Sequence, residues 1–335
     1  MNKPFFRFSN SAFIPKELRH GVVAIGNFDG IHLGHQAVLQ QALNEARDQN
    51  CPAIVLTFEP HPRSFFKPEE PVRRLTSADE KAKIFALLGF DAVIEQPFDA
   101  EFCALTAHEF VEKILINHLC VSGVIAGYDF HFGKGRSGTP DFLKQEGIKN
   151  NFTVTLVEPF KDENAQTISS SRIRSLLIQG NVEEAAKLLG YHYTLSGLVI
   201  HGEKLGRTLG FPTANIEVSS HIGLKYGVYA VRLRRQDGRL YDGVASFGRR
   251  PTVTSTGKPL LETFVFDFSG NLYDEIIAIS FFAYLRGEEK FDSLDTLVEQ
   301  MKIDEENARV VLQKTQPLSA LDRHFTFIKT YKFMH

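Results

Sequence analysis

The sequence predicts an α/β chain of two parts: a doubly wound parallel sheet, followed by a small antiparallel β-barrel with a C-terminal helix. Three observations support this prediction. The chain has 335 residues, well above the roughly 150 of an average domain. Strand and helix patterns alternate in its first half, and closely spaced strand patterns fill most of the second. We therefore expect two domains, residues 1–185 and 186–335.

In the first half, apolar runs rich in β-branched residues alternate with amphipathic patterns. The runs that predict strands are GVVAIGNF, PAIVLTFEP, DAVIEQPF, VSGVIAGYDFHF and FTVTLVEPF. Helices are expected near 35–48 and 78–88, and another opens where Thr106 and Glu109 have the spacing of a capping box. This alternation predicts a mainly parallel sheet with helices on both faces, and ligands beyond the carboxyl ends of its strands.

The pattern changes after two helical segments, ISSSRIRSLLIQ and VEEAAKLLG. Between residues 193 and 285 the β-rich segments are YTLSGLVI, YGVYAVRLRR, LYDGVASFG, LETFVFDF and EIIAISFFAYL. Asp237-Gly238 marks a hairpin turn between two of them. Short strands at this spacing predict a small antiparallel barrel, and an amphipathic helix over about 293–313 is expected to pack against it.

Composition narrows the class of function. A formal net charge of −2 with both signs interspersed gives no field that gathers nucleic acid or anionic membrane, so we expect neither as a partner. Cys51, Cys103 and Cys120 are odd in number and widely spaced, which disfavours a disulfide framework and a thiolate zinc site. No apolar window reaches the ~18 residues of a membrane span. We expect a cytoplasmic protein with small-molecule substrates, whose oligomeric state the sequence does not indicate.

The segment after the first predicted strand combines Asn27, Gly30, His32 and His35 at the start of a helix. Free backbone N–H groups and the positive end of the helix dipole suit triphosphate oxygens, and imidazoles can donate hydrogen bonds to developing charge. Each histidine could instead be a helix cap or a satisfied core residue. The succession of strand, glycine, histidine pair and helix favours a phosphate site.

A second group of candidate residues lies in the β-rich half, in the segment GRTLGFPTAN. Its glycines, Gly206 and Gly210, allow backbone amides to approach phosphate. Thr213 and Asn215 are two apart, so in extended chain their side chains face one way and could share a Mg²⁺ through oxygen. The alternative is an ordinary turn in which both side chains bond to local backbone.

Glu262 lies in the predicted strand LETFVFDF, where a period of two places it on the same face as Phe264, Phe266 and Phe268. We therefore expect its carboxylate to point where aromatic side chains are buried. Because an unpaired buried charge is costly, this carboxylate either has a structural partner or serves as a base with a tuned pKa.

Four segments of the first half resemble, in order, the motifs of one family. They are Asn27–His35 with its His-x-Gly-His signature, Phe58–Pro62, Gly127–Gly133 and Ile168–Arg174. The first resembles the nucleotidyltransferase superfamily signature, and together they resemble the adenylyltransferase half of bacterial bifunctional riboflavin kinase/FAD synthetase. Ser171 departs from the usual Thr but keeps the hydroxyl.

This resemblance implies a set of roles in the first half. His32 and His35 would stabilise the transition state and the pyrophosphate leaving ATP. Asn27 and Asp129 would lie near the flavin or the nucleotide. The remaining residues implied in binding ATP and its phosphates are Gly30, Ser169, Ser170 and Arg174.

The second half resembles the riboflavin kinase domain, because Pro-Thr-Ala-Asn is followed by a downstream strand glutamate. The agreement continues through KYGVYAV, GVASFGRRPTV and FFAYLRGEEKFDSLDTLVEQM. It implies that Glu262 is the base for the ribityl hydroxyl and that Arg286 helps to close the flavin site. Residues implied in binding ATP phosphates are Gly206, Gly210, Thr213 and Asn215, the last two also with Mg²⁺. Arg249 departs from the asparagine that many members have, and NLYDE from the common DLYG.

The resemblance thus implies a bifunctional transferase. The C-terminal domain would convert riboflavin and ATP to FMN and ADP, and the N-terminal domain FMN and ATP to FAD and pyrophosphate, both with Mg²⁺. Two alternatives are a cytidylyl- or adenylyltransferase for another phosphate, and a flavin-binding module without turnover.

A literal G-x-G-x-x-G occurs at 133–138, with Glu158 twenty residues beyond its last glycine. A dinucleotide site is therefore possible, but the motif follows several strand–helix units instead of opening the first. We also expect Thr139-Pro140 to interrupt the start of a helix. A flexible glycine loop near the flavin site is the favoured interpretation.

Overall fold

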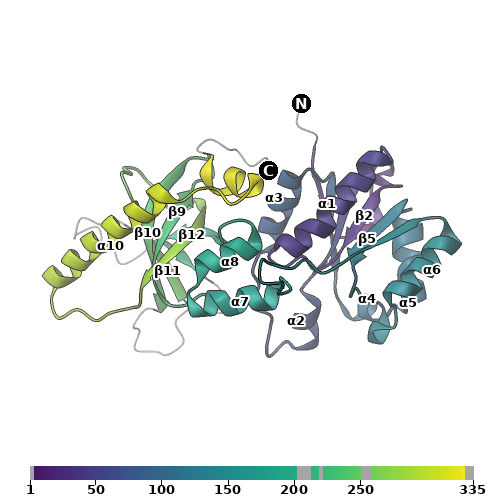
Figure 1. The fold of residues 1–335 in the computed structure, drawn as a ribbon, viewed down its shortest axis with the longest axis horizontal. Coiled ribbons are helices and arrows are strands. Elements are labelled where there is room, and N and C mark those ends of the chain that lie inside the picture. The colour runs from purple at the N-terminus through teal and green to yellow at the C-terminus, as the bar shows by residue number, and fades with distance from the viewer. Residues whose placement is uncertain (1–3, 202–212, 219–221, 250–258, 329–335) are drawn as a thin grey trace. The chain divides into compact units, whose positions relative to one another are not determined.

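The structure, a computed structural model, describes residues 4–201, 213–218, 222–249 and 259–328. They form two compact units (Figure 1). The N-terminal unit contains the residues up to 72 and residues 76–169, and the barrel unit contains residues 73–75 and those from 170 onwards. The expected domain boundary between 185 and 186 lies 16 residues beyond this division (185 − 169) and stays a prediction.

The N-terminal unit is built on a six-stranded sheet in the order β1-β4-β3-β2-β5-β6, with every neighbouring pair parallel. The central strands read as continuous apolar runs because helices cover both of their faces. This confirms the predicted parallel sheet; the short edge strand β1 was not predicted. The strands are β1 (Phe6–Phe8), β2 (Val22–Ile25), β3 (Ala53–Glu59), β4 (Ala92–Pro97), β5 (Gly123–Gly127) and β6 (Thr153–Val157).

Helices α1 and α3 lie on one side of this sheet, and α5 and α6 on the other (Figure 1). Helix α3 begins at a complete Ser77–Glu80 capping box and ends at Gly89, whose φ of 97° closes the helix in the left-handed conformation. The helices are α1 (Leu33–Asp48), α2 (Pro62–Phe66), α3 (Ala78–Leu88), α4 (Ala100–Ala104), α5 (Ala107–Glu109), its π-helical continuation η3 (Phe110–His118) and α6 (Pro140–Asn150).

The start of α6 corrects one expectation. Thr139 does not interrupt a helix but caps it, accepting a hydrogen bond from the backbone N–H of Phe142 at 3.1 Å. Pro140 is the first helical residue, where its fixed φ suits the helix and its missing N–H costs nothing. The glycine loop at 133–138 therefore leads directly into α6.

The barrel unit is a closed barrel of six antiparallel strands in the order β10-β11-β8-β7-β12-β9. Along each strand alternate side chains enter the interior, as Leu261 and Val265 do from β11. The predicted barrel is confirmed. Its strands are β7 (Thr194–Ile200), β8 (Thr213–Glu217), β9 (Gly227–Arg234), β10 (Leu240–Arg249), β11 (Pro259–Val265) and β12 (Ile276–Arg286).

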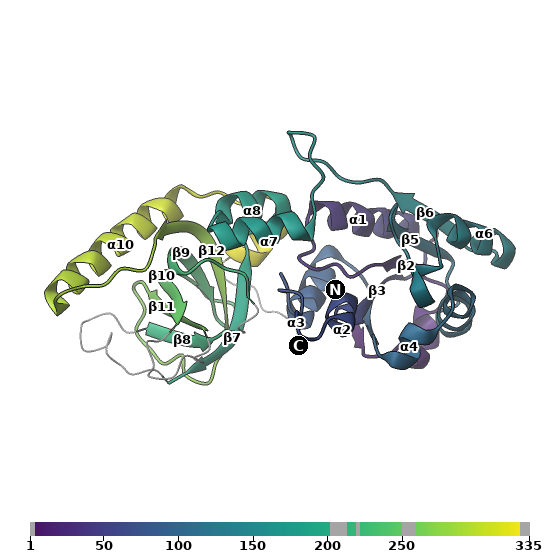
Figure 2. The same cartoon turned by 90° about the horizontal axis from the view of Figure 1, so that it is seen from below.

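The barrel unit also contains five helical segments among its described residues. The predicted C-terminal helix is α10, which packs along β9, β10 and β12, and α8 packs on β12 and α7 (Figure 2). Their bounds are α7 (Ser170–Gln179), α8 (Val182–Leu189), α10 (Leu294–Lys314), α11 (Ala320–Asp322) and η5 (Arg323–Phe327).

The stretch after residue 316 is part of the barrel unit. Asp322, fully buried, accepts hydrogen bonds from the backbone N–H of His192 at 3.0 Å and of Leu318 at 2.9 Å, and its carboxylate lies 3.0 Å from Nδ1 of His192. The Thr326 hydroxyl donates to the same carboxylate at 2.8 Å. The buried Arg234 donates to the carbonyl of residue 325 at 3.1 Å. The C-terminal segment is thus fixed to the start of β7 and to β9.

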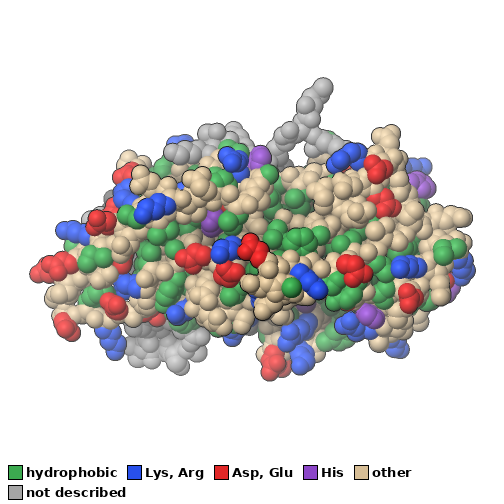
Figure 3. Space-filling view, viewed as in Figure 1, with side chains coloured by type: hydrophobic (Ala, Val, Ile, Leu, Met, Phe, Trp, Pro, Cys, Tyr) green, Lys and Arg blue, Asp and Glu red, His purple; other side chains and the backbone are tan. Residues whose placement is uncertain are grey.

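The surface carries both signs of charge. On the face shown in Figure 3, lysine and arginine side chains are interspersed with aspartate and glutamate. Within the described ranges, no helix combines the length and the apolar character that a membrane span requires.

Candidate active sites

The histidine motif lies between β2 and α1. His32 is the N-cap of α1, and its Nδ1 accepts a hydrogen bond from the backbone N–H of His35 at 3.3 Å. The two imidazole rings stack with their centroids 3.7 Å apart. A Cβ on Gly34 would approach the His32 ring to 3.2 Å, which explains why glycine separates the pair. His32 is therefore a cap, as the alternative interpretation had it, and the same contact fixes both rings side by side.

The loop before the histidines has an unusual backbone. Phe28, Gly30 and Ile31 have φ values of 48°, 85° and 36°, and the two apolar side chains are buried. Positive φ persists at a bulky residue only where the surroundings hold it. Phe28 packs edge-on against Phe85 of α3 and against His35, with ring centroids 5.8 and 5.5 Å apart. The histidines thus follow a loop with a fixed course.

This loop ends at the topological switch point of the sheet. The chain passes from β2 to β3 on one side, and β5 pairs with β2 on the other. In open α/β sheets, ligands bind beyond the carboxyl ends of such a pair of strands. Asn27 follows β2, and its buried Oδ1 has no hydrogen-bond partner within the described part of the chain. Asp129, which follows β5, is exposed. The site residues from two segments therefore meet at this edge.

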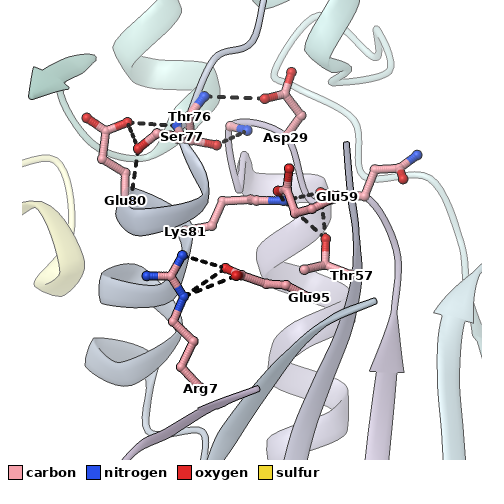
Figure 4. Close-up of polar contacts among 11 residues, drawn as sticks. Arg7, Asp29, Thr57, Glu59, Thr76, Ser77, Glu80, Lys81 and Glu95 are labelled. Carbon is pink, nitrogen blue, oxygen red and sulfur yellow. Dashed lines mark hydrogen bonds and ion pairs between the residues drawn. The ribbon is translucent and has the colours of Figure 1, made fainter. Parts of the chain in front are cut away.

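Asp29, Thr76 and Lys81 are residues that sequence analysis did not assign to the site. The Thr76 hydroxyl accepts a hydrogen bond from the backbone N–H of Gly30 at 3.0 Å. The backbone N–H of Thr76 donates to the carboxylate of the buried Asp29 at 3.3 Å (Figure 4). Lys81 contacts the carbonyl of Asn27 at 3.2 Å. The one signal in the sequence was a lysine on the apolar face of a helix, four residues before Phe85.

The ISSSR segment lies at the division of the chain. Ser169 is the last residue of the N-terminal unit, and Ser170 opens α7 in the barrel unit. Nε of Arg174 donates to the carbonyl of Arg73 at 2.7 Å, so this side chain is fixed to the short segment 73–75. The predicted helix start is confirmed, and the phosphate-binding roles of these residues stay predictions.

In the barrel, strand register brings the kinase candidates together. Asn215 of β8 is the direct cross-strand neighbour of Glu262 on β11. On the other side of Glu262, Ser246 of β10 is its neighbour, followed by Val228 of β9 and Arg286 of β12 in the same row. Directly paired residues project on the same face of a sheet. Residues 47 positions apart in the chain (262 − 215) therefore present their side chains together.

Thr213 and Asn215 lie on one face of β8, as expected. Asn215 is 4% exposed, and its buried Oδ1 accepts no hydrogen bond from any residue that the structure describes. An amide oxygen of this kind fits a ligand of Mg²⁺, which prefers hard oxygen donors. The described residues contain no group of three or more His, Cys, Asp and Glu that could hold a metal. Gly206 and Gly210 lie outside the described residues.

The environment of Glu262 corrects another expectation. Glu262 is exposed, whereas its neighbours Leu261 and Thr263 are fully buried in the barrel interior. Its carboxylate therefore does not point into a buried aromatic layer. The period of two was right, but the face that Glu262 shares with Phe264 and Phe266 is the outer one. Phe266 is buried there beside Ala308 and Leu312 of α10, whereas Glu262 is exposed.

Arg286, at the end of β12, makes a bidentate pair with Asp304 of α10. Its Nε and Nη2 lie 2.9 and 2.7 Å from the carboxylate oxygens, and Gln300 donates to the same carboxylate at 2.9 Å. The hydrogen bonds to Asp304 raise the pKa of Arg286 above its usual value. This arginine fixes the end of β12 to α10.

Comparisons with known proteins match both units. The family model described as FAD synthetase matches residues 14–172, and the one described as riboflavin kinase matches 189–312. The bifunctional riboflavin kinase/FMN adenylyltransferase of Escherichia coli K12 is 39% identical over 88% of this chain and 94% of its own length. The enzyme of the same description from Haemophilus influenzae is 40% identical over 86% and 92%.

One solved structure is similar to this chain over most of its length. A Streptococcus pneumoniae protein described as a macrolide-efflux protein has a TM-score of 0.79 and 34% identity, covering 91% of this chain and 98% of its own. Relatives that carry both named activities match over nearly their whole length. The chain belongs to the bifunctional riboflavin kinase/FMN adenylyltransferase family.

Proposed function

We propose that this chain makes FMN from riboflavin and ATP in the barrel unit, and FAD from FMN and a second ATP in the N-terminal unit. The observation that carries this proposal is the match of both units, in order, to relatives named for both activities. That match favours two reactions of flavins over cytidylyl or adenylyl transfer to the phosphate of another compound. The site geometry supports a role for each set of residues.

In the N-terminal unit, a phosphate oxygen of FMN attacks the α-phosphorus of ATP. A new P–O–P bond forms, the bond from the α-phosphorus to the bridging oxygen breaks, and pyrophosphate leaves. The stacked rings of His32 and His35 donate hydrogen bonds to the charge that develops on the leaving group. No protein nucleophile is needed, so catalysis comes from positioning and charge stabilisation.

The other residues proposed for adenylyl transfer bind and orient the two substrates. The Oδ1 of Asn27, which has no partner among the described residues, and the exposed Asp129 lie at the switch point and would contact the flavin or the nucleotide. Backbone N–H groups at the start of a helix suit phosphate, which supports the first turn of α1 for this role. Gly30, whose own N–H donates to Thr76, is proposed to let ATP approach the backbone of the loop before α1. Ser169, Ser170 and Arg174 are proposed to bind phosphate as well.

In the barrel unit, Glu262 accepts the proton of the terminal ribityl hydroxyl, and the resulting alkoxide attacks the γ-phosphorus of ATP. The exposed position of Glu262 on the outer face supports this role, because the hydroxyl of a bound substrate can reach it. ADP leaves as the new ester bond forms. Arg286, in the same row of strand neighbours, would help to close the flavin side of the site.

Mg²⁺ is proposed as the cation of the kinase site, held by Oδ1 of Asn215, the Thr213 hydroxyl and the phosphates of ATP. When bound, it would neutralise charge on the transferred phosphoryl group. The amide oxygen of Asn215, buried and without a hydrogen bond from any described residue, supports this assignment. Gly206 and Gly210 are proposed to approach the phosphates through their backbone amides.

We also propose that the chain acts in the cytoplasm. Its three cysteines, Cys51, Cys103 and Cys120, are free thiols, which persist in a reducing compartment.

The test is a time course with purified chain, riboflavin, ATP and Mg²⁺, in which flavins are separated by chromatography. We expect FMN before FAD, with release of ADP and then pyrophosphate. FMN accumulating alone would contradict the N-terminal assignment. Unchanged riboflavin together with conversion of supplied FMN to FAD would contradict the assignment of the barrel unit.

A further inference from the structure

Lys81 is a lysine in the interior of the N-terminal unit. It lies in α3, is 1% exposed, and has the buried Phe85 one turn further along the same helix. Lysine is rarely this buried unless its ammonium is paired. A buried ammonium has lost its hydration, so the groups that surround it are the reason for its presence.

Three oxygen atoms surround the Lys81 ammonium (Figure 4). Nζ lies 2.9 Å from a carboxylate oxygen of Glu59, 3.1 Å from the Thr57 hydroxyl and 3.2 Å from the backbone carbonyl of Asn27. This number equals the three N–H donors of an ammonium. The hydroxyl of Thr57, itself fully buried, also donates to the Asn27 carbonyl at 3.2 Å.

These contacts connect two strand ends at the edge where the adenylyl-transfer site is proposed. Glu59 is the last residue of β3, and Asn27 lies just beyond the end of β2. The Asn27 carbonyl receives two hydrogen bonds, while the buried Oδ1 of the same residue has no partner in the described ranges. The backbone of Asn27 is thus fixed from the sheet side, and its side-chain oxygen is left for a ligand.

The inference rests on the proposed function of the N-terminal unit. We propose that Lys81 is a positioning residue for adenylyl transfer, whose ammonium fixes the Asn27 carbonyl and thereby the Asn27 side chain and the loop to His32. It is not a catalytic residue, because with 2% of its side chain exposed the ammonium does not reach substrate.

The energetics favour this role over a purely stabilising one. Replacing both partners of a buried ion pair by apolar side chains of similar volume often leaves the stability of a fold unchanged. What the ion pair adds is direction, since the ammonium holds a carbonyl and a carboxylate at defined distances. A displacement of reacting groups by about 1 Å costs roughly 10²-fold in rate. A lysine at this place therefore contributes more to geometry than to stability.

The first test compares Lys81→Met with Lys113→Met, a lysine of η3 that is half exposed and pairs with Glu109 one turn earlier. For Lys81→Met we expect kcat for FAD formation to fall about 10²-fold, while FMN formation by the same chain changes less than about twofold. Lys113→Met should keep both rates. FAD formation by Lys81→Met within about threefold of the unsubstituted chain would overturn the inference.

The unsubstituted chain separates this inference from the proposed function. If it makes no FAD from FMN and ATP, the function proposed for the N-terminal unit fails. If it makes FAD and Lys81→Met does so equally well, only the role of Lys81 fails.

A double-variant cycle distinguishes positioning from general destabilisation. If Lys81 acts through Asn27, then Lys81→Met should cost much less in an Asn27→Ala background than in the parent chain. Rate losses that simply multiply would show two independent effects and would overturn the proposal.

Thr57 provides a milder test if Lys81→Met fails to fold. Thr57→Val keeps the shape and removes the hydroxyl between Lys81 and Asn27, and we expect kcat to fall about tenfold with little change in KM for FMN or ATP. Thr57→Ser restores the hydroxyl and should recover most of the rate. Full kcat in Thr57→Val would overturn the proposal.

Discussion

The two candidate sites of this chain are held in place by different means. In the N-terminal unit the histidines follow a loop with positive φ values, and that loop is fixed by Thr76, just before α3, and by Lys81 of α3. In the barrel unit Asn215 and Glu262 lie on adjacent strands, and the hydrogen-bonded register alone sets their separation. A site on a loop needs supporting side chains, whereas a site on strands is supported by the sheet itself.

This difference predicts where each site is vulnerable. Substitutions behind the histidine loop should reduce FAD formation, although the substituted residues touch no substrate. In the barrel, the same kind of loss should require substitution of the residues in the row itself. Because one chain carries both activities, the reaction of the unsubstituted unit controls for the amount of intact chain in each assay.

The largest effect is expected for Glu262→Gln. Glutamine keeps the size of the side chain but cannot take up the proton of the ribityl hydroxyl, and a general base contributes about 10²–10⁴ in rate. We expect FMN formation to fall about 10³-fold and conversion of supplied FMN to FAD to stay unchanged. Both rates are measured by chromatography, with riboflavin and FMN supplied in separate experiments.

The matched control is Glu299→Gln, an exposed glutamate on α10 outside the row. A Glu262→Gln chain with normal kinase activity would exclude this residue as the base. The row of strand neighbours in the barrel would then lack its proposed catalytic base.

The converse substitution is His35→Ala. It removes one of the two stacked imidazoles, and the loss of a single preorganised donor costs about 10²–10³ in rate. We expect FAD formation to fall by that factor while FMN formation continues. His108→Ala, at an exposed histidine of α5, is the control, and retained FAD synthesis in His35→Ala would remove this residue from the mechanism.

The next largest effect is expected for Asp322, which fixes the C-terminal segment to the barrel unit. Burial by itself would raise the pKa of Asp322, but hydrogen bonds from His192 and from the backbone N–H of Leu318 outweigh it and hold the pKa below its usual range. The unfolded chain therefore binds more protons in acid than the folded chain does. This stabilisation is fully present above about pH 4 and is lost as the pH falls through the lower pKa of the folded state.

We expect Asp322→Ala to lower the stability of the barrel unit by about 3 kcal/mol at neutral pH, since it leaves buried donors without their acceptor. The tyrosine near-ultraviolet circular dichroism band is a suitable measurement, because eight of the nine tyrosines follow residue 185. The thermal midpoint of this band should fall at pH 7, and the difference from the parent chain should shrink towards pH 3. An unchanged midpoint at pH 7 would show that the C-terminal segment does not support the barrel.

Much of the fold could be predicted because local patterns and tertiary structure agree. The bounds predicted for α3 match those observed, since a capping box and a left-handed glycine mark its two ends. The barrel strands show the period of two that their closed sheet requires. Patterns of this kind depend on neighbours in the sequence, and sequence analysis reads them directly.

The features that could not be predicted from the sequence depend on contacts between residues far apart in the chain. Nothing near Lys81 in the sequence indicates that its ammonium meets the carbonyl of a residue 54 positions earlier. The face of β11 that carries Glu262 could be predicted to contain Phe264, but whether that face was inside or outside depended on the closure of the barrel. The partner of Asp322 lies 130 residues away at the start of β7.

The smallest effect concerns Asn215, and it tests whether register alone can build a cation site. Asn215→Leu removes the amide oxygen without altering the strand ladder, because the backbone groups that pair β8 with β11 remain. We expect the Mg²⁺ concentration needed for half-maximal FMN formation to rise about tenfold, the lower end of what loss of one contact at a metal site costs. Asn215→Asp retains an oxygen ligand and should keep the requirement near that of the parent chain, while the Mg²⁺ requirement of FAD formation should not move in either variant. If Asn215→Leu and Asn215→Asp need the same Mg²⁺ concentration for half-maximal FMN formation, the cation binds elsewhere. The row of strand neighbours in the barrel would then contribute only the base Glu262.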